Sequence, residues 1–193
     1  KLVECSQILV DVPLNLVPQS DFDLPAAAEN GLSFVENAII KARHAARHTG
    51  LAAIADDSGL EVDALGGAPG IHSARYAGAA ASDASNNHKL LAALSGIPAE
   101  QRTARFRAVI VYLRHVEDPA PYIVEGVWEG SILSEPEGER GFGYDPLFYV
   151  PSHEVSAAAL DPAEKNRLSH RGQALRRLAA AFEGGQARLP RPA

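Results

Sequence analysis

The chain has 193 residues, 46% of them hydrophobic, which is enough to bury the core of one domain over residues 1–193 and excludes a disordered segment. Its 18 basic and 24 acidic residues give a net charge of −6, which argues against a nucleic-acid polymer as partner because a row of phosphates would meet excess negative charge. The one cysteine fits a reducing, cytoplasmic setting, and no apolar stretch approaches the roughly 18 residues of a membrane helix. We therefore expect a cytoplasmic protein with no membrane partner.

The first quarter of the chain is predicted to be mainly helical. Residues 1–11 place apolar side chains at helical spacing, and a short strand is expected at 15–17. The strongest helix prediction covers 33–49, where an apolar stripe runs along one face. Ser33 and Glu36 have the spacing of a capping box, which fixes the start of this helix.

The middle of the chain alternates between short apolar segments and turns. Residues 51–55 and 60–65 are predicted to be strands, separated by a polar loop at 56–59. A turn rich in Gly and Pro follows at 66–70. A helix is predicted over 83–94, because it begins after a serine cap and ends before a glycine.

The second half of the chain supplies a strand pair and two helices. Residues 105–113 are apolar on both faces, which is typical of a central strand, and 122–128 should be the hairpin partner. Asp161 caps a helix with Pro162 at its first position, and an amphipathic helix is expected over 170–182. These elements predict an α/β fold with a mixed central β-sheet flanked by helices.

Two adjacent carboxylates follow the apolar segment 51–55, where bare charges cannot be buried. Successive side chains of an extended chain point in opposite directions, so we expect one of Asp56 and Asp57 to face a site and the other to hold backbone or a cap. Glu29 could be a second oxygen ligand for Mg²⁺, which takes one or two carboxylates together with substrate phosphates. A solvated turn before Gly59 and an exposed loop glutamate are the competing interpretations.

The loop at 141–146 has the composition of a nucleobase site. Gly141 and Gly143 flank Phe142, which leaves the aromatic ring open to a flat ligand. Asp145 could accept hydrogen bonds from the base or the sugar. A tight aromatic turn that packs on the core is the alternative interpretation.

Three basic residues gather where the last two predicted helices meet. Lys165, His170 and Arg171 would offer donors to a phosphate or to a carbonyl of a ligand. The same residues could equally form a solvated helix surface, so this cluster indicates a site only in combination with the other motifs.

The motifs occur together and in order. Over nearly its whole length, the chain resembles the inosine triphosphate pyrophosphatase family, particularly the bacterial members that act on xanthosine and deoxyinosine triphosphates. The resemblance rests on these segments: residues 33–38, 41–42, 55–60, 65–70, 73–76, 141–146, 164–165 and 169–172.

The resemblance implies an architecture and a reaction. It implies two merged lobes with the active-site cleft between them, and a homodimer. The implied reaction hydrolyses ITP, dITP and XTP to the monophosphate and pyrophosphate, and so removes deaminated purines from the nucleotide pool in a house-cleaning role. A water bound to Mg²⁺ would attack the α-phosphorus, with Asp57 as the base.

The resemblance also implies roles for individual residues. Glu29 and Asp57 correspond to the metal-site carboxylates. Lys1 matches the lysine of a phosphate loop whose other residues, with the strand before them, are missing from this sequence, and Lys41 is a further cation for the triphosphate. Substrate contacts are implied for the following residues: Ser58, Phe142, Gly143, Tyr144, Asp145, Lys165, His170 and Arg171.

Base selectivity would follow from the purine 6-position. A keto oxygen accepts hydrogen bonds from His170 or Arg171. The amino group of adenine is itself a donor and cannot accept them. The runner-up function is a module that binds purine nucleotides without turning them over. Glycoside hydrolysis by Asp56 and Asp57 is disfavoured, because neighbours in sequence rarely straddle a sugar bond.

Overall fold

The computed structural model describes residues 2–187 of the chain. This part divides into two compact units, each with its own hydrophobic core. The described residues of unit 1 are 2–57, 108–126 and 170–187, and those of unit 2 are 58–107 and 127–169. The division passes through the three longest strands, so the carboxylate-bearing strand contributes residues to both units.

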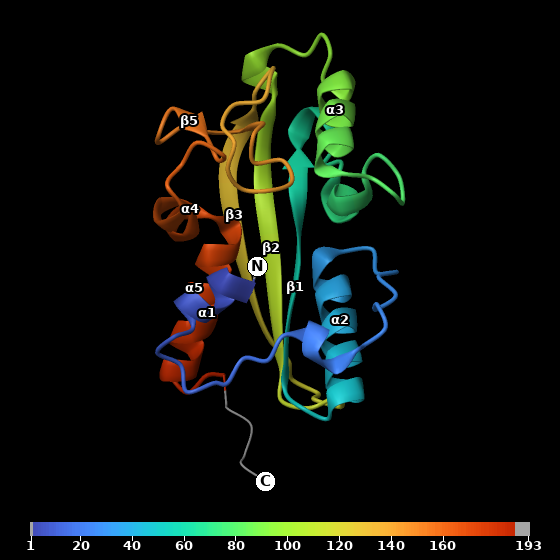
Figure 1. Cartoon of the computed structure of the whole chain (residues 1–193), viewed down its shortest axis with the longest axis vertical. Coiled ribbons are helices and arrows are strands. Elements are labelled where there is room, and N and C mark those ends of the chain that lie inside the picture. Colours follow the sequence, from blue (N-terminus) through green and yellow to red (C-terminus); the bar gives the residue numbers. More distant parts are fainter. Residues whose placement is uncertain (1, 188–193) are drawn as a thin grey trace. The chain divides into compact units, whose positions relative to one another are not determined.

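Five strands form one sheet in the order of the chain (Figure 1). They are β1 (Ala53–Val62), β2 (Thr103–Leu113), β3 (Tyr122–Ile132), β4 (Phe148–Val150) and β5 (Val155–Ser156). The expected α/β fold with a central sheet flanked by helices is confirmed. The strands run antiparallel rather than in mixed directions. Residues 114–121 join β2 and β3 as a hairpin, whereas the long connection from β1 to β2 carries α3.

Unit 1 contains the helices α1 (Leu2–Ile8), α2 (Phe34–Thr49) and α5 (His170–Glu183). The start of α5 approaches β3 so closely that a Cβ at Gly126 would lie 1.9 Å from the carbonyl oxygen of His170. Only glycine permits this approach, which fixes the first turn of α5. The core of the unit consists of Leu9, Val12, Ile110, Tyr112, Val124, Ala174, Leu175, Leu178, Ala181, Phe182 and Ala187.

Unit 2 contains α3 (Asp83–Ala93) and α4 (Pro162–Leu168). Three aromatic rings form the centre of its core, with the ring centroid of Phe148 lying 4.5 Å from that of Phe106 and 5.1 Å from that of Trp128. Short 3₁₀ helices, shared between the two units, complete the secondary structure: η1 (Gln19–Phe22), η2 (Asp63–Leu65), η3 (Gly70–Arg75) and η4 (Ala99–Gln101).

The local predictions hold best where capping or periodicity is strong. The hydroxyl of Ser33 accepts a hydrogen bond from the backbone N–H of Glu36 at 3.3 Å and caps α2 as expected. The strand expected at 15–17 is wrong, because this segment has no pairing partner in the sheet. The polar loop expected at 56–59 is also wrong, since these residues continue β1 without a break.

Among residues 2–187, no helix combines the length and the apolar character needed to cross a membrane.

Candidate active site

The carboxylates predicted to hold a metal converge on one ammonium group in unit 1. Asp57 lies on β1 and is 7% exposed, and Lys41 of α2 places its Nζ 2.6 Å from Asp57 Oδ1. The same Nζ lies 3.8 Å from Glu29 Oε1. Because one positive charge is within ion-pair distance of both carboxylates, Glu29 and Asp57 are close enough to share a cation.

The carboxyl group of Asp57 is buried and only partly satisfied by hydrogen bonds. Burial raises the pKa of its carboxyl group above the ordinary value, although the hydrogen bond and charge of Lys41 act in the opposite direction. Its second oxygen, Oδ2, is buried and has no hydrogen-bond partner among the described residues. A buried carboxylate oxygen without a partner is costly, so this atom is available to a ligand or a proton.

The segment that carries Glu29 is tied to α2 at several points. The backbone N–H of Gly31 donates to Asn37 Oδ1 at 2.9 Å, and His44 Nε2 lies 2.7 Å from the carbonyl oxygen of Pro25. A Cβ at Gly31 would lie 2.8 Å from Asn37 Oδ1, so a side chain at this position would disturb that hydrogen bond. The position of Glu29 is therefore set by α2, the same helix that supplies Lys41.

Asp56 and Asp57 bind different cations. Asp56 Oδ2 lies 3.2 Å from Arg171 Nη2, whereas Asp57 is paired with Lys41. The prediction that these neighbours do not share one partner is confirmed, because their side chains alternate along β1. The carboxylate of Asp56 pairs with the buried guanidinium group of Arg171.

The aromatic loop of unit 2 presents an exposed ring on a fixed backbone. The side chain of Phe142 is 49% exposed, and Lys165 Nζ lies 5.1 Å from its ring centroid. Asp145 is 4% exposed and accepts two hydrogen bonds, from Lys165 Nζ at 2.5 Å and from the backbone N–H of Phe142 at 2.8 Å. Asp145 therefore holds both the ring and the ammonium group beside it.

The side chain of Tyr144 lies below the loop, in the core of unit 2. Its side chain is 4% exposed in the core of unit 2, and its hydroxyl donates to the carbonyl oxygen of Ser73 at 2.8 Å. Burial raises the pKa of this phenol, so it stays neutral. Tyr144 fixes the base of the loop, while Phe142 provides the accessible surface.

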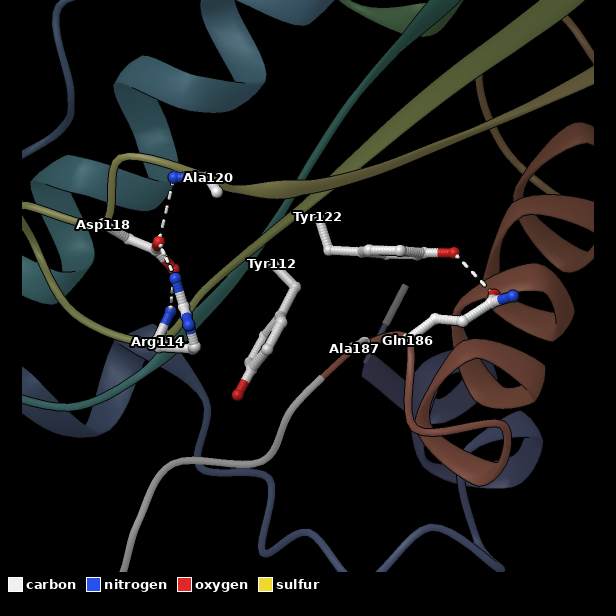
Figure 2. A pocket seen from close by; sticks show the side chains of 7 residues that line it. All are labelled: Tyr112, Arg114, Asp118, Ala120, Tyr122, Gln186 and Ala187. Carbon is white, nitrogen blue, oxygen red and sulfur yellow. Dashed lines mark hydrogen bonds and ion pairs between the residues drawn. The ribbon is translucent and has the colours of Figure 1, made fainter.

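A separate cavity of about 150 Å³ lies in unit 1, where β2 ends and β3 begins (Figure 2). Figure 2 shows Asp118 facing Arg114, and the Asp118 carboxylate also accepts a hydrogen bond from the backbone N–H of Ala120 at 3.1 Å. Arg114 keeps the pKa of Asp118 well below its usual range. None of the predicted site residues lines this cavity, which is built around an ion pair that closes the hairpin.

Comparison with known proteins places the chain in a family. A model of the Ham1 family matches residues 1–181. The chain belongs to the Ham1 family. It is 61% identical over 184 residues to a protein of Thioalkalivibrio sulfidiphilus named dITP/XTP pyrophosphatase, with 95% of this chain and 94% of that protein covered. A protein of Vibrio cholerae with the same name is 56% identical over 183 residues, covering 95% and 92%.

Solved structures support the same assignment. The structure of a HAM1 protein from Coxiella burnetii matches with a TM-score of 0.90 at 53% identity, over 95% of this chain and 93% of that chain. A nucleoside-triphosphatase / dITP/XTP pyrophosphatase from Mycobacterium abscessus matches with a TM-score of 0.74 at 46% identity, over 92% and 91%. The resemblance inferred from the sequence motifs is confirmed.

The carboxylates of this Ham1 chain fit a divalent cation only with a small set of protein ligands. No group of three or more His, Cys, Asp and Glu side chains in the described part of the chain is arranged to hold a metal. Mg²⁺ does not require such a group, because one or two carboxylates suffice when the substrate supplies phosphate oxygens. The convergence of Glu29 and Asp57 on Lys41, with Asp57 Oδ2 unsatisfied, fits that smaller ligand set.

The remaining predicted site residues fall in both units of the Ham1 chain. Ser58 follows Asp57 on β1, and His170 and Arg171 open α5 with both side chains buried. Lys1 lies outside the described residues. The sequence analysis missed Asp83 and Asn87 of α3, which bind the backbone of Gly143. Their spacing of four residues on a helix is the signal that could have grouped them.

Proposed function

We propose that this protein hydrolyses the deaminated purine nucleoside triphosphates dITP, XTP and ITP to the corresponding monophosphate and pyrophosphate. Relatives 56–61% identical over nearly the whole chain carry the name dITP/XTP pyrophosphatase, which supports this substrate class. The structural observation that carries the proposal is the buried Asp57, whose pKa is raised and whose Oδ2 has no partner among the described residues. Such a carboxylate is a stronger proton acceptor than an exposed aspartate.

Asp57 acts as the general base of the reaction. It takes a proton from a water molecule whose oxygen forms a bond to the α-phosphorus. The bond from this phosphorus to the bridging oxygen breaks, and pyrophosphate leaves with that oxygen. No covalent intermediate on the enzyme is needed.

Glu29 and Asp57 are the residues that would hold Mg²⁺. When bound, this ion supplies Lewis-acid stabilisation of the charge on the phosphate groups. Lys41 adds a fixed positive charge beside the same carboxylates. A protein with a net charge of −6 needs such local cations to bind a triphosphate.

The aromatic loop of unit 2 binds the nucleobase. The half-exposed ring of Phe142 stacks on the purine, and Lys165 and Asp145 bind the polar groups of the nucleoside. His170 and Arg171 are the candidate donors to the 6-keto oxygen. Hydrogen-bonding sites of this kind discriminate strongly against a base that presents the wrong group, which excludes adenine.

The protein works in the cytoplasm as a homodimer and has neither a nucleic-acid polymer nor a membrane as partner. These elements of the proposal rest on the composition and on the family resemblance. Size-exclusion chromatography with light scattering at several concentrations measures the oligomeric state directly.

A product assay tests the function. The protein is incubated with Mg²⁺ and, separately, with ITP, XTP, dITP, ATP and GTP, and pyrophosphate and orthophosphate are measured in parallel. We expect pyrophosphate from the first three substrates, little from the last two, and none when Mg²⁺ is removed by a chelator. Binding of ITP without release of pyrophosphate would instead identify a nucleotide-binding module, and orthophosphate as the first product would contradict cleavage at the α-phosphorus.

A further inference from the structure

The loop 141–146 is held in one conformation by bonds within itself. The carboxylate of Asp145 accepts the backbone N–H of Phe142 at 2.8 Å, and the backbone N–H of Asp145 donates to the carbonyl oxygen of Phe142 at 3.3 Å. Gly143 adopts a φ of +62°, a conformation that favours glycine, and the space around it would accept a Cβ. Glycine at this position therefore serves the turn itself and not a close packing contact.

Helix α3 binds both backbone polar groups of Gly143. The carboxylate of Asp83 accepts the Gly143 N–H at 2.6 Å, and the Asn87 amide donates to the Gly143 carbonyl oxygen at 2.9 Å. Asp83 and Asn87 are four residues apart, so they lie one above the other on the same face of the helix. One helix thus fixes the residue next to the exposed ring of Phe142 from two directions.

Helix α3 is itself firmly anchored in unit 2. The hydroxyl of Ser82 caps its first turn and Ser85 returns a hydrogen bond at 2.9 Å, which completes a capping box. Leu90 is fully buried in the core of the unit. Asn86 binds the segment 74–77 through Ala77 N–H at 2.8 Å and the carbonyl oxygen of Ala74 at 3.2 Å. A loop bound to this helix is attached to a rigid element.

We propose that Asp83 and Asn87 are positioning residues that hold the Gly143 peptide and thereby orient the Phe142 ring for a purine base. The inference rests on the proposed function and deepens it by naming what sets the geometry of its nucleobase site. Without these contacts, a glycine-rich loop would lose conformational entropy each time a ligand bound to its aromatic side chain. A loop that is already fixed loses less entropy on binding.

The two contacts differ in strength. Asp83 is a charged acceptor in the first turn of α3, where the helix dipole favours a negative charge, and hydrogen bonds to charged groups are stronger than neutral ones. Asn87 makes a neutral bond to a carbonyl oxygen. Loss of Asp83 should therefore have the larger effect on nucleotide binding.

Steady-state kinetics with ITP test the proposal on Asp83→Ala, Asn87→Ala and the double variant. We expect the KM for ITP to rise about tenfold in Asp83→Ala and about threefold in Asn87→Ala, with kcat within about twofold of the wild type. Because both residues hold the same glycine, the double variant should be less impaired than the product of the two single effects. Asp83→Asn keeps an acceptor at this position and should recover part of the loss.

A probe without a base distinguishes positioning from general damage. Inorganic tripolyphosphate should inhibit the wild type and all four variants with the same inhibition constant, because it cannot use the aromatic loop. The control variant His88→Ala changes an exposed residue of α3, leaves both contacts to Gly143 in place and should leave the KM for ITP unchanged. An unchanged KM in Asp83→Ala, or a parallel rise of KM and the tripolyphosphate constant, would overturn the proposal.

Hydrogen exchange of the Gly143 amide can be measured independently of catalysis. The amide of Gly143 should exchange faster in Asp83→Ala and Asp83→Asn than in the wild type, whether or not the protein turns over ITP. If the wild type releases no pyrophosphate, the proposed function fails, but faster exchange together with weaker IMP binding in these variants would still support the positioning role. Unchanged exchange at Gly143 in a folded Asp83→Ala protein contradicts it.

Discussion

The carboxylate cluster of unit 1 and the aromatic loop of unit 2 are constructed on different principles. In unit 1 the key atoms are charged side chains, and Asp57, Lys41 and Glu29 are placed by mutual attraction across elements that pack together. In unit 2 the key surface is an apolar ring, and it is placed by hydrogen bonds to its backbone, such as the one from Phe142 N–H to Asp145. Charge arrangement therefore determines the first region, and backbone geometry the second.

This difference has consequences for what each region can do. A buried carboxylate with a raised pKa stores free energy that a proton or a cation can release, so it suits a chemical step. The half-exposed ring of Phe142 carries no charge and can contribute only shape complementarity and stacking, so it suits recognition of a ligand. Substitutions in the two regions should accordingly affect different kinetic constants.

The largest effect is expected from Asp57→Asn. This change keeps the shape of the side chain but removes the proton acceptor, and general-base catalysis typically contributes about 10²- to 10⁴-fold to a rate. We expect kcat for ITP to fall by about that factor, measured by pyrophosphate release, while circular dichroism shows an unchanged fold.

A matched carboxylate on the same strand provides the control. Glu61 lies on β1 and pairs with Arg107 at 3.3 Å. Glu61→Gln should leave kcat close to that of the wild type. If Asp57→Asn retained more than about a tenth of the activity, the assignment of Asp57 as the base would be wrong.

Phe142→Ala should change recognition and leave the chemical step intact. Loss of one base-stacking contact costs about 1–3 kcal/mol, which corresponds to a rise in the KM for ITP of roughly 5- to 150-fold. Phe142→Tyr keeps an aromatic face and should bind nearly as well as the wild type. Equal losses of kcat in Phe142→Ala and Asp57→Asn would remove the distinction between the two regions.

A smaller effect, which reports directly on the ionisation of Asp57, is expected in the pH dependence of kcat/KM. Asp57 must be deprotonated to act as a base, so activity falls as the pH drops through its pKa. Because burial raises that pKa, the fall should be centred above the ordinary value of 3.8. Lys41→Met removes an interaction that lowers the pKa, so the acidic limb should move further toward neutral pH in this variant.

Lys41 also contributes charge for the triphosphate, so the magnitude of kcat/KM is expected to fall in Lys41→Met. The informative quantity is the position of the acidic limb. A limb that stays in place, or that moves to lower pH, would show that Lys41 does not control the ionisation of Asp57.

The sequence predicted most reliably the features determined by neighbouring residues. The helix from Phe34 to Thr49 follows from its local cap, and the separation of Asp56 from Asp57 follows from alternation along a strand. The strands β4 and β5 were not predicted, because three and two residues are too few to show a period.

Contacts between distant residues depend on packing and could not be predicted in the same way. Lys41 and Asp57 are 16 residues apart, and Asp83 and Gly143 are 60 apart, so no local pattern links them. The loop expected at 56–59 is a strand because its polar side chains find partners on helices that the local sequence does not reveal. Family resemblance supplied the candidate residues of the site but not the helix that holds its aromatic loop.

Asp118 sharpens the comparison within unit 1, because it is a buried carboxylate with the opposite electrostatic balance. It is 1% exposed, and Arg114 lowers its pKa by donating hydrogen bonds from its side chain and backbone, whereas burial dominates at Asp57. The lowered pKa of Asp118 in the folded state stabilises the protein at pH values above the ordinary 3.8, and this contribution is lost progressively as the pH falls below 3.8.

Asp118→Asn should therefore lower the Tm at pH 7 by about 5 °C, and the difference from the wild type should shrink toward pH 3. Thermal denaturation followed by circular dichroism at both pH values measures this difference, with kcat for ITP as the companion measurement. Because Asp118 stabilises a hairpin and contacts no proposed substrate group, kcat should not change; a loss of kcat comparable to that of Asp57→Asn would mean that the two carboxylates are not separate in function.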